Sequence, residues 1–165
     1  MDEGTLFLSI MYKEEKVLKE ALNHIERDIG TVFFKIKDYD FNFTDYYEKE
    51  FGSGLKKTIY VFDGRIKKDE LVEIKVLCGQ IELDFADEIS GKRSINIDPG
   101  YFNEMEVVLA SFKGKEFKED LGDGIFAHKV LEFEDGKAKE FFHTFEDFKS
   151  KDVQDFFINM SVLYS

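Results

Sequence analysis

The chain has 165 residues, of which 43% are hydrophobic, and this is enough for one domain, residues 1–165, with a substantial buried core. Its 35 acidic side chains outnumber 23 basic ones and give a net charge of −12, which opposes the binding of nucleic acids and anionic membrane surfaces. The sequence has no apolar run near the roughly 18 residues that cross a bilayer, no basic start of a secretion signal and only one cysteine, so we expect a cytoplasmic protein without membrane or nucleic-acid partners.

The first part of the chain alternates strand and helix patterns. Apolar residues recur at helical spacing in two segments, and short β-type runs flank both. We therefore expect the order β-α-β-β-α-β, at residues 5–11, 13–28, 32–37, 58–63, 69–87 and 94–98. This order predicts an α+β fold with a ferredoxin-like split βαβ core, in which both helices cover one face of an antiparallel sheet.

The remainder of the chain predicts an antiparallel meander and a final helix. Glycine-containing turn signals separate β-type runs at 107–112, 117–121, 125–133 and 137–144. The first of these runs is also compatible with a helix. Ser150 is expected to cap an amphipathic helix whose apolar stripe includes Val153, Phe157 and Met160.

The segment 91–101 is the most informative place to look for a polar site. It puts Lys92 and Arg93 before a short β-type run in which Asn96 and Asp98 alternate with isoleucines, so both polar side chains point to one face. The chain's only proline follows and is expected to end the strand. Asp98 has an alternative structural role, an Asx-turn in which its carboxylate accepts a backbone amide.

Acidic and aromatic residues gather in the loop 38–50. Its start resembles an EF-hand calcium loop, but Phe43 replaces the turn glycine and Lys49 replaces the bidentate glutamate. Asp45 and Glu48 are three residues apart, so one helical turn would direct both carboxylates to the same side and allow them to hold a hard divalent cation. The alternative is a short helix with solvated acids at its start.

The segment 52–58 superficially resembles a phosphate-binding loop, yet it lacks a glycine directly before the Lys-Thr pair and is followed by a strand. Lys56 and Lys57 are instead expected to begin that strand, where they can serve as counter-charges for an anion. The three histidines show no ligand spacing, and Cys78 lies on the apolar stripe of a helix, which predicts a buried thiol.

Four blocks in the sequence resemble a known family. They are Phe43–Glu50, Gly54–Lys57, Gly91–Arg93 with Asn96–Tyr101, and Leu121–Ile125. With these blocks the chain resembles the uncharacterised prokaryotic family called domain of unknown function 4416, some members of which carry the label GTP-binding protein. The resemblance supports the location of a site and implies no particular reaction.

From these patterns we expect a domain that binds a small anionic ligand, a nucleotide or a phosphorylated metabolite, with or without a divalent cation such as Mg²⁺ or Mn²⁺. The alternative is a non-catalytic module whose acidic surface docks a protein partner. The predicted ligand-binding residues are Tyr46, Tyr47, Lys56, Lys57, Lys92, Arg93, Asn96 and Tyr101. The predicted metal ligands are Asp45, Glu48 and Asp98.

Overall fold

A nine-stranded, mostly antiparallel sheet organises the computed structural model, which describes residues 2–112 and 118–164. In chain order the elements are β1 (Glu3–Tyr12), α1 (Glu15–Asp28), β2 (Val32–Lys35), β3 (Tyr39–Asp40), α2 (Glu48–Phe51), β4 (Lys56–Lys67), α3 (Glu70–Asp84), β5 (Ile95–Phe102), β6 (Glu106–Ser111), β7 (Glu119–Gly122), β8 (Ile125–Glu134), β9 (Lys137–Glu140), the 3₁₀ turn η1 (Glu146–Lys149) and α4 (Lys151–Tyr164). The predicted α+β class is therefore confirmed.

The strands follow the spatial order β2-β4-β1-β5-β6-β8-β7, while β3 pairs with β4 and β9 pairs with β8. Strand β1 lies between β4 and β5 and is antiparallel to both. All but the first of its residues are buried, because neighbouring strands cover both of its edges and helices pack on both faces of the sheet. This explains the nearly unbroken apolar run at the start of the sequence.

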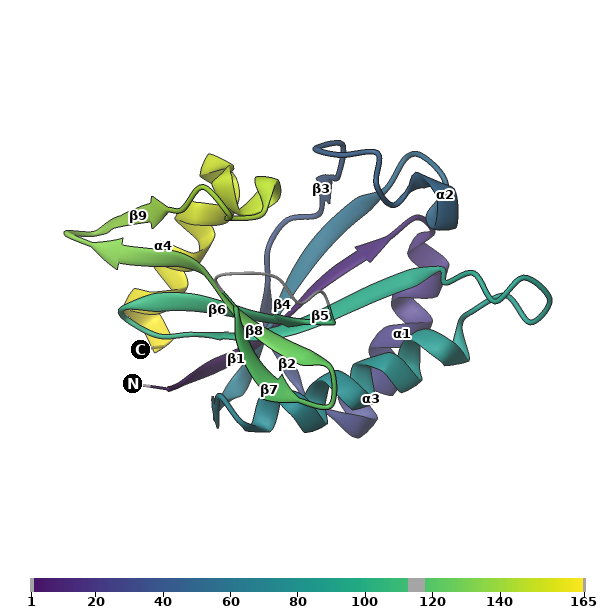
Figure 1. Cartoon of the computed structure of the whole chain (residues 1–165), viewed down its shortest axis with the longest axis horizontal. Helices are drawn as coiled ribbons and strands as arrows, with labels where there is room; N and C mark the ends of the chain where they lie inside the picture. Colours follow the sequence, from purple (N-terminus) through teal and green to yellow (C-terminus); the bar gives the residue numbers. More distant parts are fainter. Residues whose placement is uncertain (1, 113–117, 165) are drawn as a thin grey trace.

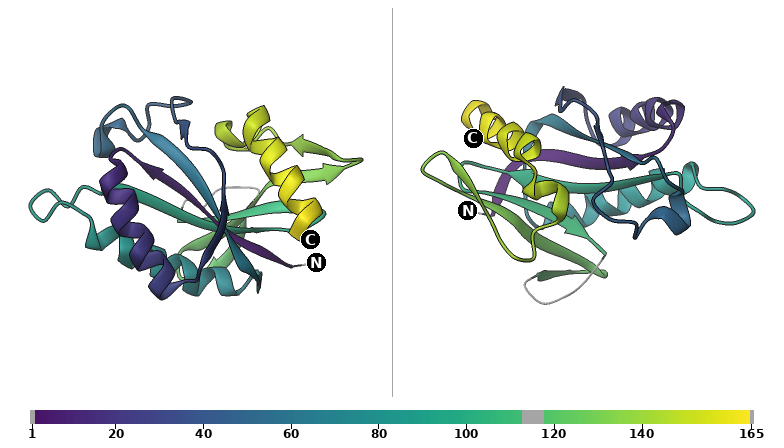
Figure 2. Two further views of the ribbon diagram at one scale, coloured as in Figure 1. Left: turned by 180° about the vertical axis from the view of Figure 1, so that it is seen from behind. Right: turned by 90° about the horizontal axis from the view of Figure 1, so that it is seen from above.

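Helices cover the two faces of the sheet differently (Figure 1). Helices α1 and α3 lie side by side on one face. There Ala21 of α1 and Cys78 of α3 belong to the same core cluster as Leu8 of β1. On the other face, Phe148 of η1 and Phe157 of α4 pack against the sheet. The further views in Figure 2 show α4, in yellow, apart from α1 and α3. The first half of the chain thus supplies one helical layer and its carboxyl-terminal end supplies the other.

Strand β5 continues through Pro99, so the prediction that proline ends the strand is wrong. Pro99 pairs with Leu8 of β1, and the strand runs to Phe102. The backbone N–H of Ile97, two residues earlier, points away from β1 toward α3, and the nitrogen of Pro99 has the same orientation. Since β6 pairs with β5 only from Gly100 onward, the missing N–H removes no ladder bond.

The other predicted ends of strands and helices differ less from those in the structure. The segment 107–112 is mainly strand and not helix, whereas the strand expected at 137–144 ends at residue 140 and is followed by η1. The turn expected at 113–115 and the first residue of the run 117–121 lie outside the described residues. Ser150 precedes α4 as expected, and its Oγ accepts a hydrogen bond from the N–H of Val153 at 3.4 Å. Within the described residues no helix combines the length and apolar character required to span a bilayer.

Cys78 is predicted to be chemically inert in the folded protein. Its side chain is fully buried between α3 and the sheet, and burial raises the pKa of the thiol well above its usual range. Because the thiolate is the reactive species, a soluble thiol reagent should modify native protein far more slowly than the urea-unfolded chain at the same pH. Equal rates in the two states would contradict this expectation.

Candidate functional site

A pocket of about 850 Å³ lies over the sheet face that also carries α4. Lys57, Asp98 and Ser111 contribute to its floor from β4, β5 and β6. The segment 41–50 forms one wall, and the segment 144–147 forms the opposite wall. Three regions that are distant in the sequence therefore meet around one cavity.

The strands β5 and β6 diverge at the pocket floor. They pair only between Gly100 and Phe102 on β5 and between Val107 and Leu109 on β6. Residues 95–99 of β5 and 110–111 of β6 do not pair with each other, and we call these two portions together the β5–β6 fork. Lys75 of α3 reaches the fork, where its Nζ donates to the Ile97 carbonyl at 2.9 Å and to Asp98 Oδ1 at 2.8 Å.

Helix α3 also satisfies the other backbone group of Ile97. The N–H of Ile97 donates to Glu82 Oε2 at 2.7 Å. Lys75 and Glu82 are seven residues apart, so they project from the same side of the helix. Together their side chains occupy the hydrogen-bonding positions that a neighbouring strand would otherwise fill at Ile97.

Asp98 is held ionised by its neighbours. Burial raises the pKa of its carboxyl, but the ion pair with Lys75 and the hydrogen bond from Asn96 Nδ2, at 3.1 Å, outweigh this effect, and the pKa lies below its usual value. Burial lowers the pKa of Lys75, but the negative charges of Asp98 and Glu82 together raise it by more, so its pKa lies above the usual value and the ammonium group stays protonated. Among the described residues, side chains and not a backbone amide donate to Asp98, so the Asx-turn interpretation is wrong.

Arg93 connects β5 with the wall formed by residues 41–50. Its Nε and Nη2 donate to the two carboxylate oxygens of Glu50 at 2.8 and 3.0 Å, and its Nη1 donates to Asn96 Oδ1 at 2.8 Å. The guanidinium also lies over the Phe51 ring, 5.2 Å from its centroid. The hydrogen bonds from Arg93 lower the pKa of Glu50, so this bidentate pair remains charged on both sides.

Lys57 connects β4 with η1. Its Nζ donates to Asp147 Oδ2 at 3.0 Å, and the Tyr39 hydroxyl donates to the same oxygen at 3.0 Å. Burial and the adjacent Asp147 carboxylate raise the pKa of Tyr39. The side chain of Asp147 is 2% exposed and that of Lys57 is 12% exposed, so this is a largely buried ion pair at the pocket wall.

Six of the predicted site residues line the pocket: Tyr46, Tyr47, Lys57, Arg93, Asn96 and Asp98. Lys56 and Tyr101 do not, because each has the opposite strand parity to its pocket-facing neighbours Lys57 and Asp98. Tyr101 is fully buried against α3 in a cluster with Leu71. Their predicted contact with the ligand is therefore not supported by the placement of their side chains.

The remaining predicted residues lie outside the pocket. Lys92 is exposed in the loop between α3 and β5. Asp45 and Glu48 are exposed before and at the start of α2, and the structure does not bring them to Asp98. In the part of the chain that the structure describes, no three His, Cys, Asp or Glu side chains form a set that could hold a metal ion.

Sequence reasoning missed Lys75, Ser111 and Asp147, which all line the pocket. Lys75 could have been recognised from the sequence, because it and Glu82 interrupt the apolar helical stripe that contains Leu71 and Cys78, and all four residues are buried. Charged residues on a buried stripe require partners, and these partners lie in a polar site. Ser111 and Asp147 carried no comparable signal.

Two histidines that are distant in the sequence meet behind the pocket wall. The rings of His128 and His143 stack with centroids 4.9 Å apart, and His128 also contacts the pocket-lining Phe145. Burial, with smaller effects from Lys118 and His143, lowers the pKa of His128 to about 4. His128 is therefore neutral at physiological pH.

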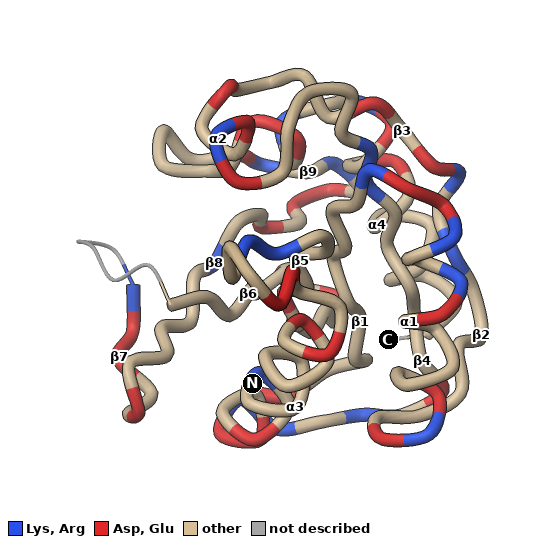
Figure 3. Tube along the Cα trace, turned by 90° about the vertical axis from the view of Figure 1, so that its right-hand side faces the viewer, with Lys and Arg blue, Asp and Glu red and all other residues tan. Residues whose placement is uncertain are grey.

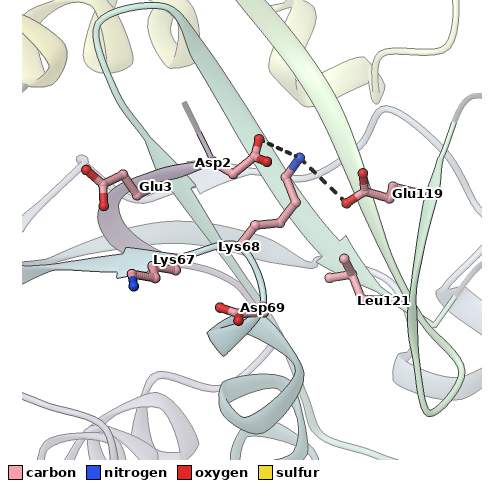
Figure 4. A pocket seen from close by; sticks show the side chains of 7 residues that line it. All are labelled: Asp2, Glu3, Lys67, Lys68, Asp69, Glu119 and Leu121. Carbon is pink, nitrogen blue, oxygen red and sulfur yellow. Dashed lines mark ion pairs between the residues drawn. The ribbon is translucent and has the colours of Figure 1, made fainter.

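A second, smaller pocket of about 480 Å³ lies near the start of β1 (Figure 4). At its rim Lys68 forms ion pairs with Asp2 at 3.1 Å and with Glu119 at 3.6 Å. None of the predicted site residues lines it. The larger pocket is therefore the candidate functional site.

Comparison with known proteins identifies the family of this chain. No curated protein matches the chain, and no solved structure matches it. The family model described as "Domain of unknown function (DUF4416)" matches residues 2–164. The chain therefore belongs to the DUF4416 family of domains of unknown function.

Proposed function

We propose that the larger pocket binds a small anionic ligand, either a nucleotide or a phosphorylated metabolite. The observation that carries the proposal is the charge of its lining. Five basic side chains line the pocket beside four acidic ones, although acids outnumber bases by 35 to 23 in the whole chain. The basic residues are Lys49, Lys57, Lys75, Arg93 and Lys118. Figure 3 shows acidic and basic residues interspersed along much of the rest of the trace.

Exposed aromatic rings support a ligand with a flat ring. Phe43, Tyr46 and Phe112 line the pocket and are 39%, 66% and 55% exposed. Aromatic faces that remain open beside a polar cavity are suited to stacking against a heterocycle. A volume of about 850 Å³ also lies within the range of roughly 300–1,000 Å³ that is typical of small-molecule sites.

Lys57 is the best candidate for direct contact with the anionic group. A protonated lysine has three N–H donors, and among the described residues Lys57 makes one hydrogen bond, to Asp147. Arg93 in contrast engages Nε and both terminal nitrogens with Glu50, Asn96 and Glu82. A phosphate oxygen can therefore bind Lys57 without displacing an existing partner.

Replacement of Lys57 by glutamine tests the proposed function. We expect nucleoside monophosphates and inorganic phosphate to bind the wild type, and the variant to bind them about 10-fold more weakly or worse, because a charge-assisted hydrogen bond is lost. Glutamine keeps a donor for Asp147. Isothermal titration calorimetry measures the affinities, and Lys56→Gln, an adjacent change on the opposite strand face, is the matched control.

Equal losses in the two lysine variants would contradict this role of Lys57. A wild type that binds neither phosphate nor any nucleoside monophosphate would reject the proposed function. Mass spectrometry of small molecules released on denaturation would identify a ligand that purifies with the protein.

We also propose a ferredoxin-like split βαβ core for the first half of the domain. The strand order β5-β1-β4-β2, with antiparallel pairing at each step, supports it, as does the position of α1 and α3 on one face. A cytoplasmic location without nucleic-acid partners remains our proposal from the composition. The divalent cation is left out of the proposed site, because Asp45 and Glu48 do not line the pocket beside Asp98.

The alternative is a protein-interaction module. It is favoured by Phe33 and Phe34 on the edge strand β2, which are 55% and 42% exposed and contact the ring of Tyr164. The alternative predicts that neither nucleotides nor phosphate bind the protein. The same calorimetric titrations therefore decide between the two functions.

A further inference from the structure

Two hydrogen-bond donors at the β5–β6 fork line the pocket and have unused capacity among the described residues. Ser111 is 7% exposed, and its buried Oγ has no hydrogen-bond partner in the part of the chain that the structure describes. Lys75 is 2% exposed and makes two hydrogen bonds, to Ile97 and Asp98, which leaves one N–H of its ammonium group. Buried polar groups in folded proteins normally have partners, so within residues 2–112 and 118–164 the fork lacks an acceptor for these two donors.

The ammonium group of Lys75 also lies close to the end of β6. The ammonium nitrogen lies 5.0 Å from the ring centroid of Phe112, the residue after Ser111. Its two occupied donors are directed to β5 on the other side of the fork. An acceptor atom within the fork can therefore bind Lys75 and Ser111 together.

The charges at the fork select an uncharged acceptor over an anion. The charge of Lys75 is balanced by Asp98 at 2.8 Å, and that of Arg93 by Glu50 at 2.8 Å. Glu82 adds a further buried carboxyl 3.4 Å from Arg93. An anion placed here would approach two acidic side chains, Asp98 and Glu82, and would find one remaining N–H on Lys75. Lys57 is also paired with an acid, but it is more exposed, 12% against 2% for Lys75, and among the described residues it keeps two N–H donors for an anion. A carbonyl or hydroxyl oxygen would accept both hydrogen bonds at the fork without the repulsion from the two carboxyl groups.

We propose that the β5–β6 fork is a subsite for an uncharged oxygen of the ligand, such as the carbonyl of a heterocycle or the hydroxyl of a sugar. This inference rests on the proposed function, which places the anionic group near Lys57. The ligand then spans the pocket with its charged end at Lys57 and its neutral, hydrogen-bond-accepting end between Lys75 and Ser111. Phe112 offers a ring surface beside the neutral end.

Titrations of the ¹⁵N-labelled full chain with separate neutral and anionic probes test the subsite. Uridine and adenosine are the uncharged probes, and inorganic phosphate is the anionic probe. We expect the nucleosides to shift the backbone amide signals of Ile97, Ser111 and Phe112, and phosphate to shift those of Lys57 and Asp147. Each titration also gives an affinity for its probe.

A serine pair provides the matched variants. Ser111→Ala should weaken nucleoside binding about 3- to 10-fold, because one hydrogen bond to the ligand is lost, and should leave phosphate affinity unchanged. Ser9→Ala should change neither affinity. Ser9 is 2% exposed and its Oγ also lacks a partner among the described residues, but it does not line the pocket.

The outcomes separate the subsite from the proposed function. Nucleosides that shift the fork signals, with phosphate inactive throughout the pocket, would support the subsite and reject the anionic ligand. Phosphate that shifts the fork as strongly as the nucleosides would overturn the neutral subsite. Nucleosides that leave the fork unaffected, or that bind Ser111→Ala as tightly as the wild type, would overturn it as well, with a bound water as the remaining partner of Ser111.

Discussion

Replacement of Gly100 by alanine is expected to destabilise the protein by about 3 kcal/mol or more. A Cβ atom at this position would lie 2.3 Å from the carbonyl oxygen of Val108 and 2.5 Å from Cζ of Phe7. The first contact is with the backbone of β6, which cannot move without disturbing the pairing of β5 with β6. Urea denaturation followed by circular dichroism measures the change in the free energy of unfolding.

Gly79→Ala is the control for this prediction. Gly79 lies inside α3, and apart from its chain neighbours and the backbone of its own helix a Cβ atom there would meet no heavy atom within 4 Å. Since alanine is the better helix former, this variant should be more stable than the wild type by up to about 1 kcal/mol. If both glycine variants were equally stable, close packing at Gly100 would not be important.

Lys75→Met is expected to cost about 3 kcal/mol of the free energy of unfolding, because it leaves Asp98, whose side chain is only 19% exposed, without the cation that pairs with it. The methionine fills most of the volume of the lysine but donates no hydrogen bond to Asp98 or to the Ile97 carbonyl. Chemical denaturation measures the loss. Lys151→Met removes an exposed ion pair with Asp155 and should leave stability nearly unchanged.

The pH dependence of the free energy of unfolding shows whether the Lys75→Met variant loses stability through the missing ion pair or through poorer packing. In the wild type the pKa of Asp98 lies below its ordinary value, so its ionised form stabilises the fold above about pH 4, the pKa region of an unfolded aspartate, and this stability is lost as the pH falls through the folded pKa. In Lys75→Met the cation that lowers the pKa of Asp98 is missing, so the effect of burial, which raises this pKa, is no longer outweighed. Protonation of Asp98 at lower pH then removes its unpaired negative charge.

The deficit of the Lys75→Met variant should therefore shrink as the pH falls from about 7 to 5. A deficit that stays constant over this range would indicate that Lys75 contributes through packing alone. A double variant, Lys75→Met with Asp98→Asn, removes the buried charge and should recover part of the lost stability at neutral pH.

The sequence was sufficient to predict the elements whose patterns are local. The apolar periodicities of α1, α3 and α4 and the turn glycines before and after β8 predicted these elements within a few residues. The course of β5 through Pro99 could not be predicted, because it depends on where β6 begins to pair. Local patterns do not contain that information.

The same distinction applies to the candidate site. Strand alternation correctly placed Asn96 and Asp98 on one face, and the hydrogen bond between them is consistent with it. Applied strictly, alternation would also have removed Tyr101 and Lys56 from the predicted ligand contacts. Asp147 and Ser111 reach the pocket through the packing of η1 and the pairing of β6 with β8, which no short motif specifies.

The side chains of Lys75 and Glu82 have a consequence for how this protein behaves at high concentration. An unpaired strand edge is a template on which another chain can add a strand, and such additions lead to aggregation. At Ile97 both backbone groups of the open edge are already bonded within the same molecule. Helix α3 thereby protects the part of β5 that β6 does not pair with from intermolecular pairing, while the pocket beside it stays open to a small molecule.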